Sequence, residues 1–245
     1  MLLNPDAQAD AVVAMSGGQD STTCLAWALE EVGAGRVHAV TFDYGQKHRV
    51  ELECAAEICE QWNVPQTVLT IPAFNELGAA ALTNRNIDVD ADAAGTGNEH
   101  AERIGLPSTF VPGRNLIFLG LVAAYAAQHD IPNVITGVCA ADEAGYPDCR
   151  PEFIVSFQDT ARIAMGIQST DKLKVYAPLL YLDKAGTFAL ADESGALKTI
   201  IEQTHTCYNG DHETFHRWGY GCGDCPACQE RANGFQLFEA SQTPA

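Results

Sequence analysis

Short apolar runs alternate with longer segments of helical periodicity along most of this chain. We predict β-strands in the apolar runs, which occupy residues 11–15, 36–45, 66–72, 133–138 and 173–180. We predict α-helices where apolar residues recur with helical spacing, at residues 21–33, 48–62, 113–130, 151–167 and 183–195. Because alternating strands and helices form βαβ units, the pattern predicts an α/β fold with a doubly wound parallel sheet.

Residues typical of helix ends support several of these boundaries. Gly33 follows the first predicted helix, Pro151 occupies a first-turn position, and Asp183 precedes a later helix. In the helix at 48–62, the expected buried face consists of Leu52, Ala55, Ala56 and Cys59.

Two segments interrupt the alternation of strands and helices. Residues 82–108 are acidic, rich in glycine and alanine, and without an apolar period, so we expect a lid or a partly disordered loop there. From about residue 205, cysteine, glycine and histidine become frequent. We therefore expect an α/β domain over residues 1–204 and a small C-terminal zinc-binding subdomain over residues 205–245.

The composition supports a large core and disfavours one class of partner. With 245 residues, 47% of them hydrophobic, the chain can bury a substantial core without covalent cross-links. Its 14 lysines and arginines stand against 32 aspartates and glutamates, which gives a formal net charge of −18. Since nucleic-acid affinity depends on cationic side chains that neutralise phosphates, we expect no nucleic-acid partner.

Nothing in the sequence indicates export or membrane insertion. The first ten residues lack a basic region followed by an apolar one, and no apolar run is long enough to span a bilayer. The nine cysteines are an odd number in a large core-forming domain, which argues against a disulfide framework. We expect a cytoplasmic protein with no membrane partner, and buried thiols at Cys24, Cys54, Cys59, Cys139 and Cys149.

A glycine-rich loop joins the first predicted strand to the first predicted helix. Gly17 and Gly18 allow the backbone to approach an anion, and Ser16, Ser21 and Thr22 add hydroxyl groups. The loop has no lysine, so it is not a Walker loop, and it suits a leaving pyrophosphate better than a transferred γ-phosphoryl group. We predict nucleotidyl transfer. The alternative is a tight turn in which Asp20 or Ser21 caps the helix.

The string SGGQDS at residues 16–21 resembles the SGGxDS signature of the N-type ATP pyrophosphatases, or PP-loop enzymes. Together with TFDYGQKH (41–48), FVPGRNLIFL (110–119), TGVCAADEAGYPDCRPEF (136–153) and the cysteine-rich tail, it resembles the QueC family of 7-cyano-7-deazaguanine synthases over about residues 11–238. The resemblance implies a Rossmann-like fold, a homodimer and a role in queuosine biosynthesis. It also implies ATP-dependent ligation of 7-carboxy-7-deazaguanine and ammonia to a nitrile, through an adenylated carboxylate and an amide.

With ATP as the implied substrate, the loop and the start of the following helix become its expected binding residues. These are Met15, Ser16, Gly17, Gly18, Gln19, Asp20, Ser21, Thr22, Thr23, Cys24 and Leu25. We expect Asp20 to contact Mg²⁺ that bridges the phosphates. No glutaminase sequence is evident, so free ammonia is the expected nitrogen donor.

Charged residues at the carboxyl ends of the predicted strands are the other candidates for the site. These ends are followed by residues 16–23, 43–48, 139–150 and 180–184, and ligands of open α/β sheets bind there. We expect Asp20 and Ser21 to act in catalysis together with the cations Lys47, Arg114 and Lys184, which neutralise phosphates or a substrate carboxylate. Arg150 is a further candidate. For Lys47 and Arg150, a surface ion pair fits the sequence equally well.

A deazaguanine ring presents an N–H group and an amine side by side, and one carboxylate can accept hydrogen bonds from both. Residues 139–150 supply Asp142, Glu143 and Asp148, with Tyr146 available for stacking. We expect Asp148 to read this edge of the substrate, with Gly137 and Tyr146 beside it. The alternative is that Asp148 caps the helix that begins near Pro151.

The cysteines of the tail have the spacing of a metal site. Cys207, Cys222, Cys225 and Cys228 can converge on one tetrahedral Zn²⁺, and four protein ligands leave no open position, so the predicted zinc is structural. The alternatives are a redox pair, plain buried thiols, or His205 as a ligand in place of a cysteine. We expect His212 and His216 to lie in a solvated loop.

Two other functions remain open from the sequence. One is a PP-loop enzyme that modifies transfer RNA, which the net charge of −18 disfavours. The other is a non-catalytic module that binds zinc and nucleotide, which the many polar residues at the strand ends disfavour.

Overall fold

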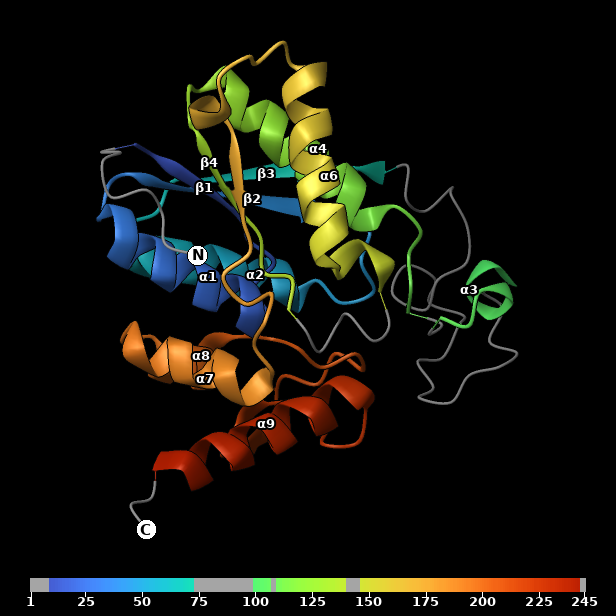
Figure 1. Ribbon diagram of the computed structural model, residues 1–245. Coiled ribbons are helices and arrows are strands. Elements are labelled where there is room, and N and C mark those ends of the chain that lie inside the picture. The colour runs from blue at the N-terminus through green and yellow to red at the C-terminus, as the bar shows by residue number, and fades with distance from the viewer. Residues whose placement is uncertain (1–8, 73–98, 107–108, 140–145, 243–245) are drawn as a thin grey trace.

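A parallel sheet with helices on both faces forms the body of the protein. The computed structural model describes residues 9–72, 99–106, 109–139 and 146–242. The strands β1 (Ala11–Ala14), β2 (Val37–Asp43), β3 (Gln66–Thr70), β4 (Asn133–Ile135) and β5 (Lys174–Tyr176) lie in the order β3-β2-β1-β4-β5 and are all parallel (Figure 1). The predicted doubly wound α/β sheet is therefore confirmed.

The two faces of the sheet are buried under different helices. The helices α1 (Gln19–Val32) and α2 (Val50–Gln61) cover one face, and α4 (Arg114–Gln128) and α6 (Pro151–Ala164) cover the other (Figure 1). Residues alternate along β1, so Val12 belongs to the cluster with α4 and α6, whereas Ala11 and Val13 belong to the cluster with α1 and α2. Burial on both faces explains why the strands read as continuous apolar runs.

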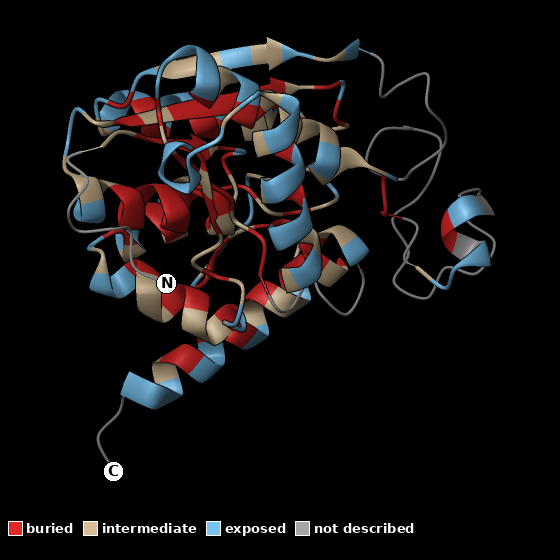
Figure 2. Ribbon diagram, turned by 45° about the horizontal axis from the view of Figure 1, so that its top comes forward, coloured by how far each residue is buried: buried red, intermediate tan, exposed pale blue. Residues whose placement is uncertain are grey.

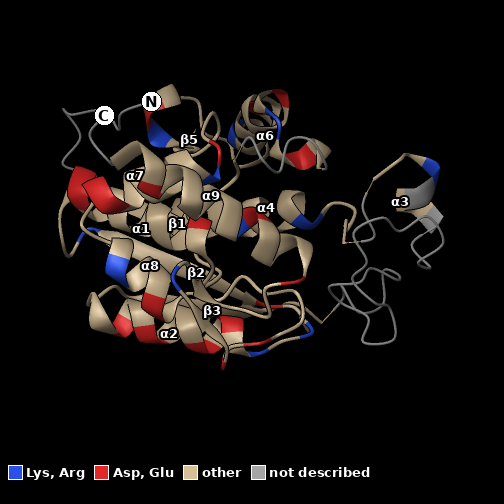
Figure 3. Ribbon diagram, turned by 90° about the horizontal axis from the view of Figure 1, so that it is seen from below, with Lys and Arg blue, Asp and Glu red and all other residues tan. Residues whose placement is uncertain are grey.

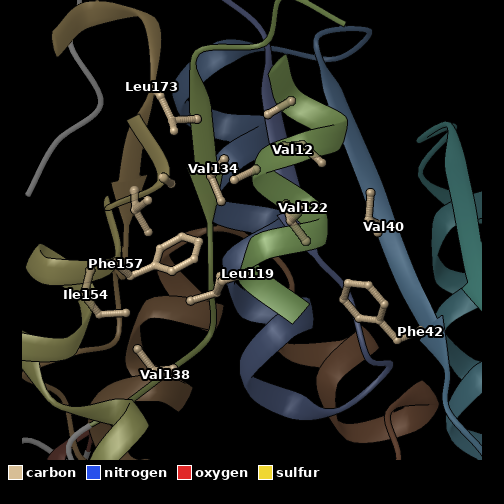
Figure 4. Packing of buried hydrophobic residues seen from close by; sticks show 14 of the residues in the cluster. Val12, Val40, Phe42, Leu119, Val122, Val134, Val138, Ile154, Phe157 and Leu173 are labelled. Carbon is tan, nitrogen blue, oxygen red and sulfur yellow. The ribbon is translucent and has the colours of Figure 1, made fainter. Parts of the chain in front are cut away.

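The larger of these clusters shows how the core is assembled. Side chains from β1, β2 and β4 meet the inner sides of α4 and α6, as the labelled residues of Figure 4 show. Phe42 and Phe118 stack with ring centroids 4.2 Å apart. Buried residues are concentrated in the strands and on the helix surfaces that face them (Figure 2). Each fully buried large apolar side chain contributes about 1.5–3 kcal/mol to folding.

The observed strands end earlier than the apolar runs predict. β4 ends at Ile135 and β5 at Tyr176, although the runs continue to residues 138 and 180. Beyond these points the two segments no longer pair with each other, but Val138 and Leu179 remain buried. Burial without strand pairing preserves the apolar pattern, which is why the sequence could not locate these ends.

Several predicted helix ends are confirmed. Gly33 terminates α1 with a φ of 88°, and Pro151 begins α6. The Asp183 side chain accepts a hydrogen bond of 2.8 Å from the Gly186 N–H group at the start of α7 (Lys184–Glu193). The alternative that Asp20 or Ser21 caps the first helix is wrong, because α1 begins at Gln19, after Gly18, and no side chain caps it.

Two other expectations need correction. The buried residues of α2 are Cys54, Ala55, Ile58 and Cys59, whereas Ala56 is exposed, so the helix is rotated from the predicted face. A short helix, α3 (Glu99–Arg103), lies within the segment 82–108 that we expected to be irregular, and its Ala101 is buried. Residues 82–98 lie outside the described part of the chain. Short 3₁₀ helices occupy Pro147–Cys149 and Thr170–Lys172.

The C-terminal tail packs on α7 and α8 (Leu197–Gln203) rather than standing apart. It contains a small hairpin, β6 (Phe215–His216) and β7 (Gly219–Tyr220), followed by α9 (Pro226–Gln242), which lies beside α7 (Figure 1). One apolar cluster joins Phe188 and Ile200 to Trp218 and Phe235. The proposed division at residues 204 and 205 stays a prediction, and this cluster crosses it. No helix in the described ranges has both the length and the apolar character that crossing a bilayer requires.

A fully buried arginine joins the parts of this tail. Arg231 of α9 donates hydrogen bonds to the Trp218 and Ile200 carbonyl groups, at 2.9 and 2.6 Å, and to the Thr204 and Thr206 hydroxyls, both at 2.9 Å. Burial lowers the pKa of Arg231 to about 10, so the guanidinium remains charged at neutral pH.

We expect Arg231→Ala to destabilise the protein by about 3–5 kcal/mol, because buried carbonyl groups would lose their donors. The matched control is Arg217→Ala, since Arg217 is exposed and pairs with Glu239, and its loss should cost less than about 1 kcal/mol. Urea unfolding followed by circular dichroism measures both. Equal effects of the two substitutions would contradict a structural role for the buried arginine.

Candidate functional site

The glycine loop between β1 and α1 is held from two sides. Gly17 has a φ of +88°, and a Cβ atom there would lie 2.2 Å from the Glu51 carbonyl oxygen of α2. On the other side, the His205 N–H group of the tail donates a hydrogen bond of 3.0 Å to the Gly17 carbonyl group. Only glycine satisfies both the left-handed conformation and the close approach of α2.

Two serine hydroxyls stabilise the loop from within. Ser21 Oγ accepts a hydrogen bond of 3.1 Å from the Ser16 N–H group and lies 3.0 Å from Ser16 Oγ and 3.2 Å from the Gly18 carbonyl oxygen. The loop therefore presents small polar groups and the N-terminal end of α1 at one place. This arrangement suits an oxyanion such as a phosphate.

A cavity of about 290 Å³ opens beside this loop. It lies beyond the carboxyl ends of β1, β2 and β4, where the strand order reverses, which is the usual ligand position in open α/β sheets. Ten of the predicted site residues line it: Met15, Ser16, Gly18, Gln19, Asp20, Ser21, Lys47, Arg114, Gly137 and Tyr146. The cavity is large enough for part of a nucleotide-sized ligand.

Five residues of the loop and of α1 that we expected to bind ATP do not line the cavity. Gly17 shapes the loop from below, and the side chains of Thr22, Thr23, Cys24 and Leu25 are buried in α1. None of these four residues lines the cavity, and their contact with ATP stays a prediction. Thr23 Oγ1 donates to the Gln19 carbonyl group, and Leu25 packs in the core.

Lys184 reaches the site through an acidic partner. Its Nζ atom lies 2.6 Å from Asp20 Oδ2 and 3.6 Å from the buried Cys139 sulfur, and Lys184 itself does not line the cavity. Lys184 therefore forms an ion pair with Asp20, and its expected contact with a ligand stays a prediction. The second oxygen, Asp20 Oδ1, is buried without a hydrogen-bond partner among the described residues, so it is the atom available to a ligand or ion.

Asp148 has a different structural partner from the one we expected. Its Oδ2 atom accepts a hydrogen bond of 3.3 Å from the Asn115 N–H group, in the first turn of α4. The alternative that Asp148 caps the helix starting at Pro151 is wrong. The N-cap residue of this helix is the exposed Arg150, and no side chain forms a capping hydrogen bond there. Asp148 lies outside the cavity lining, and its role in substrate recognition stays a prediction.

Glu51, Tyr44 and Arg114 line the cavity and interact with one another electrostatically. Burial raises the pKa of Glu51 to about 7, and the Arg114 cation opposes this shift. Burial and the charge of Glu51 raise the pKa of Tyr44 to about 12, while a hydrogen bond with Arg114 lowers it. Burial lowers the pKa of Arg114, but Tyr44, Tyr146 and Asp148 outweigh it and keep this pKa above the usual value.

The four tail cysteines converge on one point. Their sulfur atoms all lie within 4.8 Å of one another, with 3.9 Å between Cys207 and Cys225 and 4.0 Å between Cys222 and Cys228. A tetrahedral Zn²⁺ with zinc–sulfur bonds of about 2.3 Å places its sulfurs roughly 3.8 Å apart, so the cluster fits such an ion. The N–H groups of Cys222 and Cys225 also point at ligand sulfurs, at 3.5 and 3.4 Å.

Comparison with known proteins decides the family. The sequence model described as "Queuosine biosynthesis protein QueC" matches residues 10–239. The chain belongs to the QueC family. A 7-cyano-7-deazaguanine synthase of Wolinella succinogenes is 42% identical over 98% of this chain and 98% of its own length. One of Shouchella clausii is 45% identical over 93% of this chain and 94% of its own.

The solved structures add a more distant likeness. The U34-tRNA thiolase NcsA from Methanococcus maripaludis, solved with its 4Fe-4S cluster, is 13% identical and has a TM-score of 0.43, covering 95% of this chain and 65% of that one. At this similarity the match carries no information on function. The resemblance seen in the sequence motifs is confirmed by the family match and the curated relatives.

The cavity also contains residues that the sequence analysis did not predict to lie there. Tyr44 and Glu51 line the cavity, and so do His205, Thr206 and Tyr208 from the tail. Tyr44 lies in the segment 43–48 after a predicted strand, so its position in the sequence could have indicated a residue of the site. Glu51 lies inside a helix, and the tail residues reach the cavity only through tertiary packing, so no local pattern indicates them.

The histidines of the tail lie outside the cysteine cluster that the described residues form. His205 Nε2 lies 3.0 Å from the Cys207 carbonyl oxygen, and its Nδ1 lies 3.3 Å from His212 Nδ1, so the ring does not point into the cysteine cluster. His212 and His216 are half-buried rather than solvated as expected. His212 packs on Tyr220, and His216 stacks on Trp218 with centroids 4.4 Å apart.

A substitution pair tests the constraint on the glycine loop. Gly17 and Gly35 have nearly the same positive φ, +88° and +87°, but a Cβ at Gly35 meets nothing within 4 Å. Gly35→Ala should cost about 1–2 kcal/mol from backbone strain alone. Gly17→Ala should cost roughly 1–3 kcal/mol more, because the methyl group collides with α2. Thermal unfolding of both variants measures the difference, and equal losses would contradict the clash.

Proposed function

We propose that this protein is an ATP-dependent carbon–nitrogen ligase that converts 7-carboxy-7-deazaguanine and ammonia into 7-cyano-7-deazaguanine, in queuosine biosynthesis. The observation that supports this most strongly is the lysine-free phosphate loop beside a cavity that also contains Lys47 and Arg114, in a chain of the QueC family. The names of the curated relatives agree with this product.

The chemistry explains why such a site needs ATP. A carboxylate repels nucleophiles, and its oxygen is a poor leaving group. Transfer of AMP neutralises the carboxylate and creates a good leaving group, so ammonia can form an amide. Activation of the amide oxygen by a second ATP then allows its loss and formation of the nitrile. The protein contributes mainly positioning and charge stabilisation.

The described residues supply groups for these tasks. In the proposal, the loop around Ser16 and Ser21 holds the departing pyrophosphate, and Lys47 and Arg114 on the cavity wall neutralise phosphate or carboxylate oxygens. The unpartnered Oδ1 atom of Asp20 suits Mg²⁺, which would neutralise the phosphates when bound. Lys184 acts as a positioning residue that holds the Asp20 side chain.

Substrate recognition is assigned to the wall formed by β4 and the following segment. Gly137 lies close to α1. A Cβ atom at this position would be 3.1 Å from the Ser21 nitrogen, so a residue with a side chain would crowd the start of the helix. The Tyr146 hydroxyl lies 2.6 Å from Thr109 Oγ1, and this contact orients the ring that we propose stacks on the substrate. Asp148, two residues after Tyr146 in the chain, remains the proposed reader of the deazaguanine edge.

Three further assignments complete the proposal. The cysteine cluster holds one structural Zn²⁺ per chain. The protein is a cytoplasmic homodimer, and exposed apolar side chains on α4 and α6, Leu116 at 50%, Val155 at 60% and Ile163 at 82%, support a contact between copies. It has no nucleic-acid partner, since its 32 acidic residues outnumber its 14 lysines and arginines, and several of the acidic residues lie along α2 (Figure 3).

Mass spectrometry of the products tests the reaction. We expect the purified protein to convert 7-carboxy-7-deazaguanine, ATP and ammonium into the amide and then the nitrile, with AMP and pyrophosphate released in equal amounts. Omission of ammonium should leave only the adenylated acid and pyrophosphate. Release of ADP instead of AMP would contradict the role of the phosphate loop, and no turnover would contradict the function.

Metal analysis tests the cysteine cluster. We expect about one zinc per chain, and at least about 100-fold weaker retention against a chelator after Cys225→Ala, because this buried thiol is one of the four that converge. Cys59→Ala, a buried thiol of α2, is the control and should retain the metal. Since His205, Thr206 and Tyr208 flank Cys207 and line the cavity, ATP binding should weaken when zinc is lost. Full zinc retention by Cys225→Ala would contradict the ligand set.

A further inference from the structure

One acidic side chain of the cavity, Glu51, forms no close ion pair with the part of the chain that the structure describes. Glu51 lies in the first turn of α2 and lines the cavity together with the phosphate loop. No hydrogen bond or ion pair within 4.0 Å joins its carboxylate to any residue in the described ranges. Tyr44 and Arg114, with which Glu51 interacts electrostatically, line the same cavity.

The nitrogen substrate creates a demand for such a group. At neutral pH an amine such as ammonia is almost entirely protonated, and the ammonium ion has no lone pair with which to attack an acyl carbon. An anionic side chain beside the reacting carbon both attracts the cation and removes its proton. Since Asp20 is paired with Lys184, Glu51 is the cavity carboxylate that is not already paired among the described residues.

We propose that Glu51 binds the ammonium ion and acts as the general base that generates ammonia for attack on the adenylated carboxylate. This inference rests on the proposed function and adds a catalytic residue to it. The ammonium nitrogen gives one proton to the Glu51 carboxylate, and its freed electron pair forms the C–N bond to the acyl carbon. The C–O bond to the phosphate breaks, AMP leaves with that electron pair, and a second nitrogen proton passes to water.

The surroundings of Glu51 suit this task. Because the cavity wall shields it from water, its pKa is raised to about 7, which is the range in which a general base both accepts and releases a proton easily. The titratable or charged groups that share the cavity from α1 and the end of β2 are Asp20, Tyr44, Lys47 and His48. Those from α4, the segment before α6 and the tail are Arg114, Tyr146, Cys149, His205 and Tyr208. Of these, Arg114 is the one that opposes the shift of Glu51.

The pH dependence follows from this ionisation. As the pH falls below about 7, Glu51 becomes protonated and cannot accept a proton, so ammonia-dependent turnover should fall. Above that pH, the wild-type rate at a fixed total ammonium concentration should level off. In Glu51→Gln, only free ammonia reacts, so the rate should continue to rise about tenfold per pH unit toward the pKa of ammonium.

The decisive experiment replaces the nucleophile. Hydroxylamine is mostly uncharged at pH 7, so it attacks the adenylated acid without a base and gives the hydroxamic acid. We expect Glu51→Gln to reduce amide formation from ammonium at pH 7 by about 10²–10⁴-fold, and hydroxamic acid formation by no more than a few-fold. Glu53→Gln, which removes an exposed carboxylate two residues away on α2, is the matched control and should resemble the wild type with both nucleophiles.

Pyrophosphate release from ATP and 7-carboxy-7-deazaguanine without a nitrogen source reports folding and adenylation, and Glu51→Gln should retain it within a few-fold. Glu51→Asp keeps a carboxylate and should recover part of the ammonium-dependent rate. Equal losses with both nucleophiles, or an unchanged pH profile in Glu51→Gln, would overturn the assignment of Glu51. Absence of amide and nitrile from the wild type would instead overturn the proposed function.

Discussion

The position of one glycine determines how the site is built. Gly17, in the loop after β1, has a left-handed backbone conformation. The backbone of α2 lies so close to it that no side chain can be accommodated there. Its carbonyl group is held by the N–H group of His205 from the tail. Three segments that are distant in the sequence therefore meet at this turn, and the phosphate loop keeps its shape because all three support it.

This contact gives the cysteine-rich tail a part in the site. Cys207 is two residues from His205, and Tyr208 both lines the cavity and offers its carbonyl group to His48, whose Nε2 atom lies 3.0 Å away. The buried Arg231 fixes the neighbouring Thr206. A metal ion at the cysteines would therefore restrain a wall of the nucleotide cavity, since the ligand segment and the wall are the same stretch of backbone.

The electrostatics of the cavity differ from those of the acidic surface. The chain carries a net charge of −18, yet Lys47 and Arg114 lie on the cavity wall and Lys184 lies just behind it. An anionic substrate and a nucleotide require such a concentration of cations. Lys184 compensates the charge of Asp20, whereas Glu51 has no such partner in the described part of the chain and retains a near-neutral pKa. Asp20 and Glu51 therefore lie in one cavity but differ in whether a close cation compensates their charge.

The sequence by itself determined the parallel sheet, the glycine loop after β1 and the group of four cysteines that converge in the tail. Each of these depends on local pattern or on a short motif, because apolar runs, a glycine pair and ligand spacing act over few residues. Only the tertiary structure decided that Asp148 bonds to the first turn of α4, that Lys184 pairs with Asp20, and that Glu51 faces the cavity. These contacts join residues far apart in the chain, and their geometry depends on how helices rotate when their apolar faces pack on the sheet.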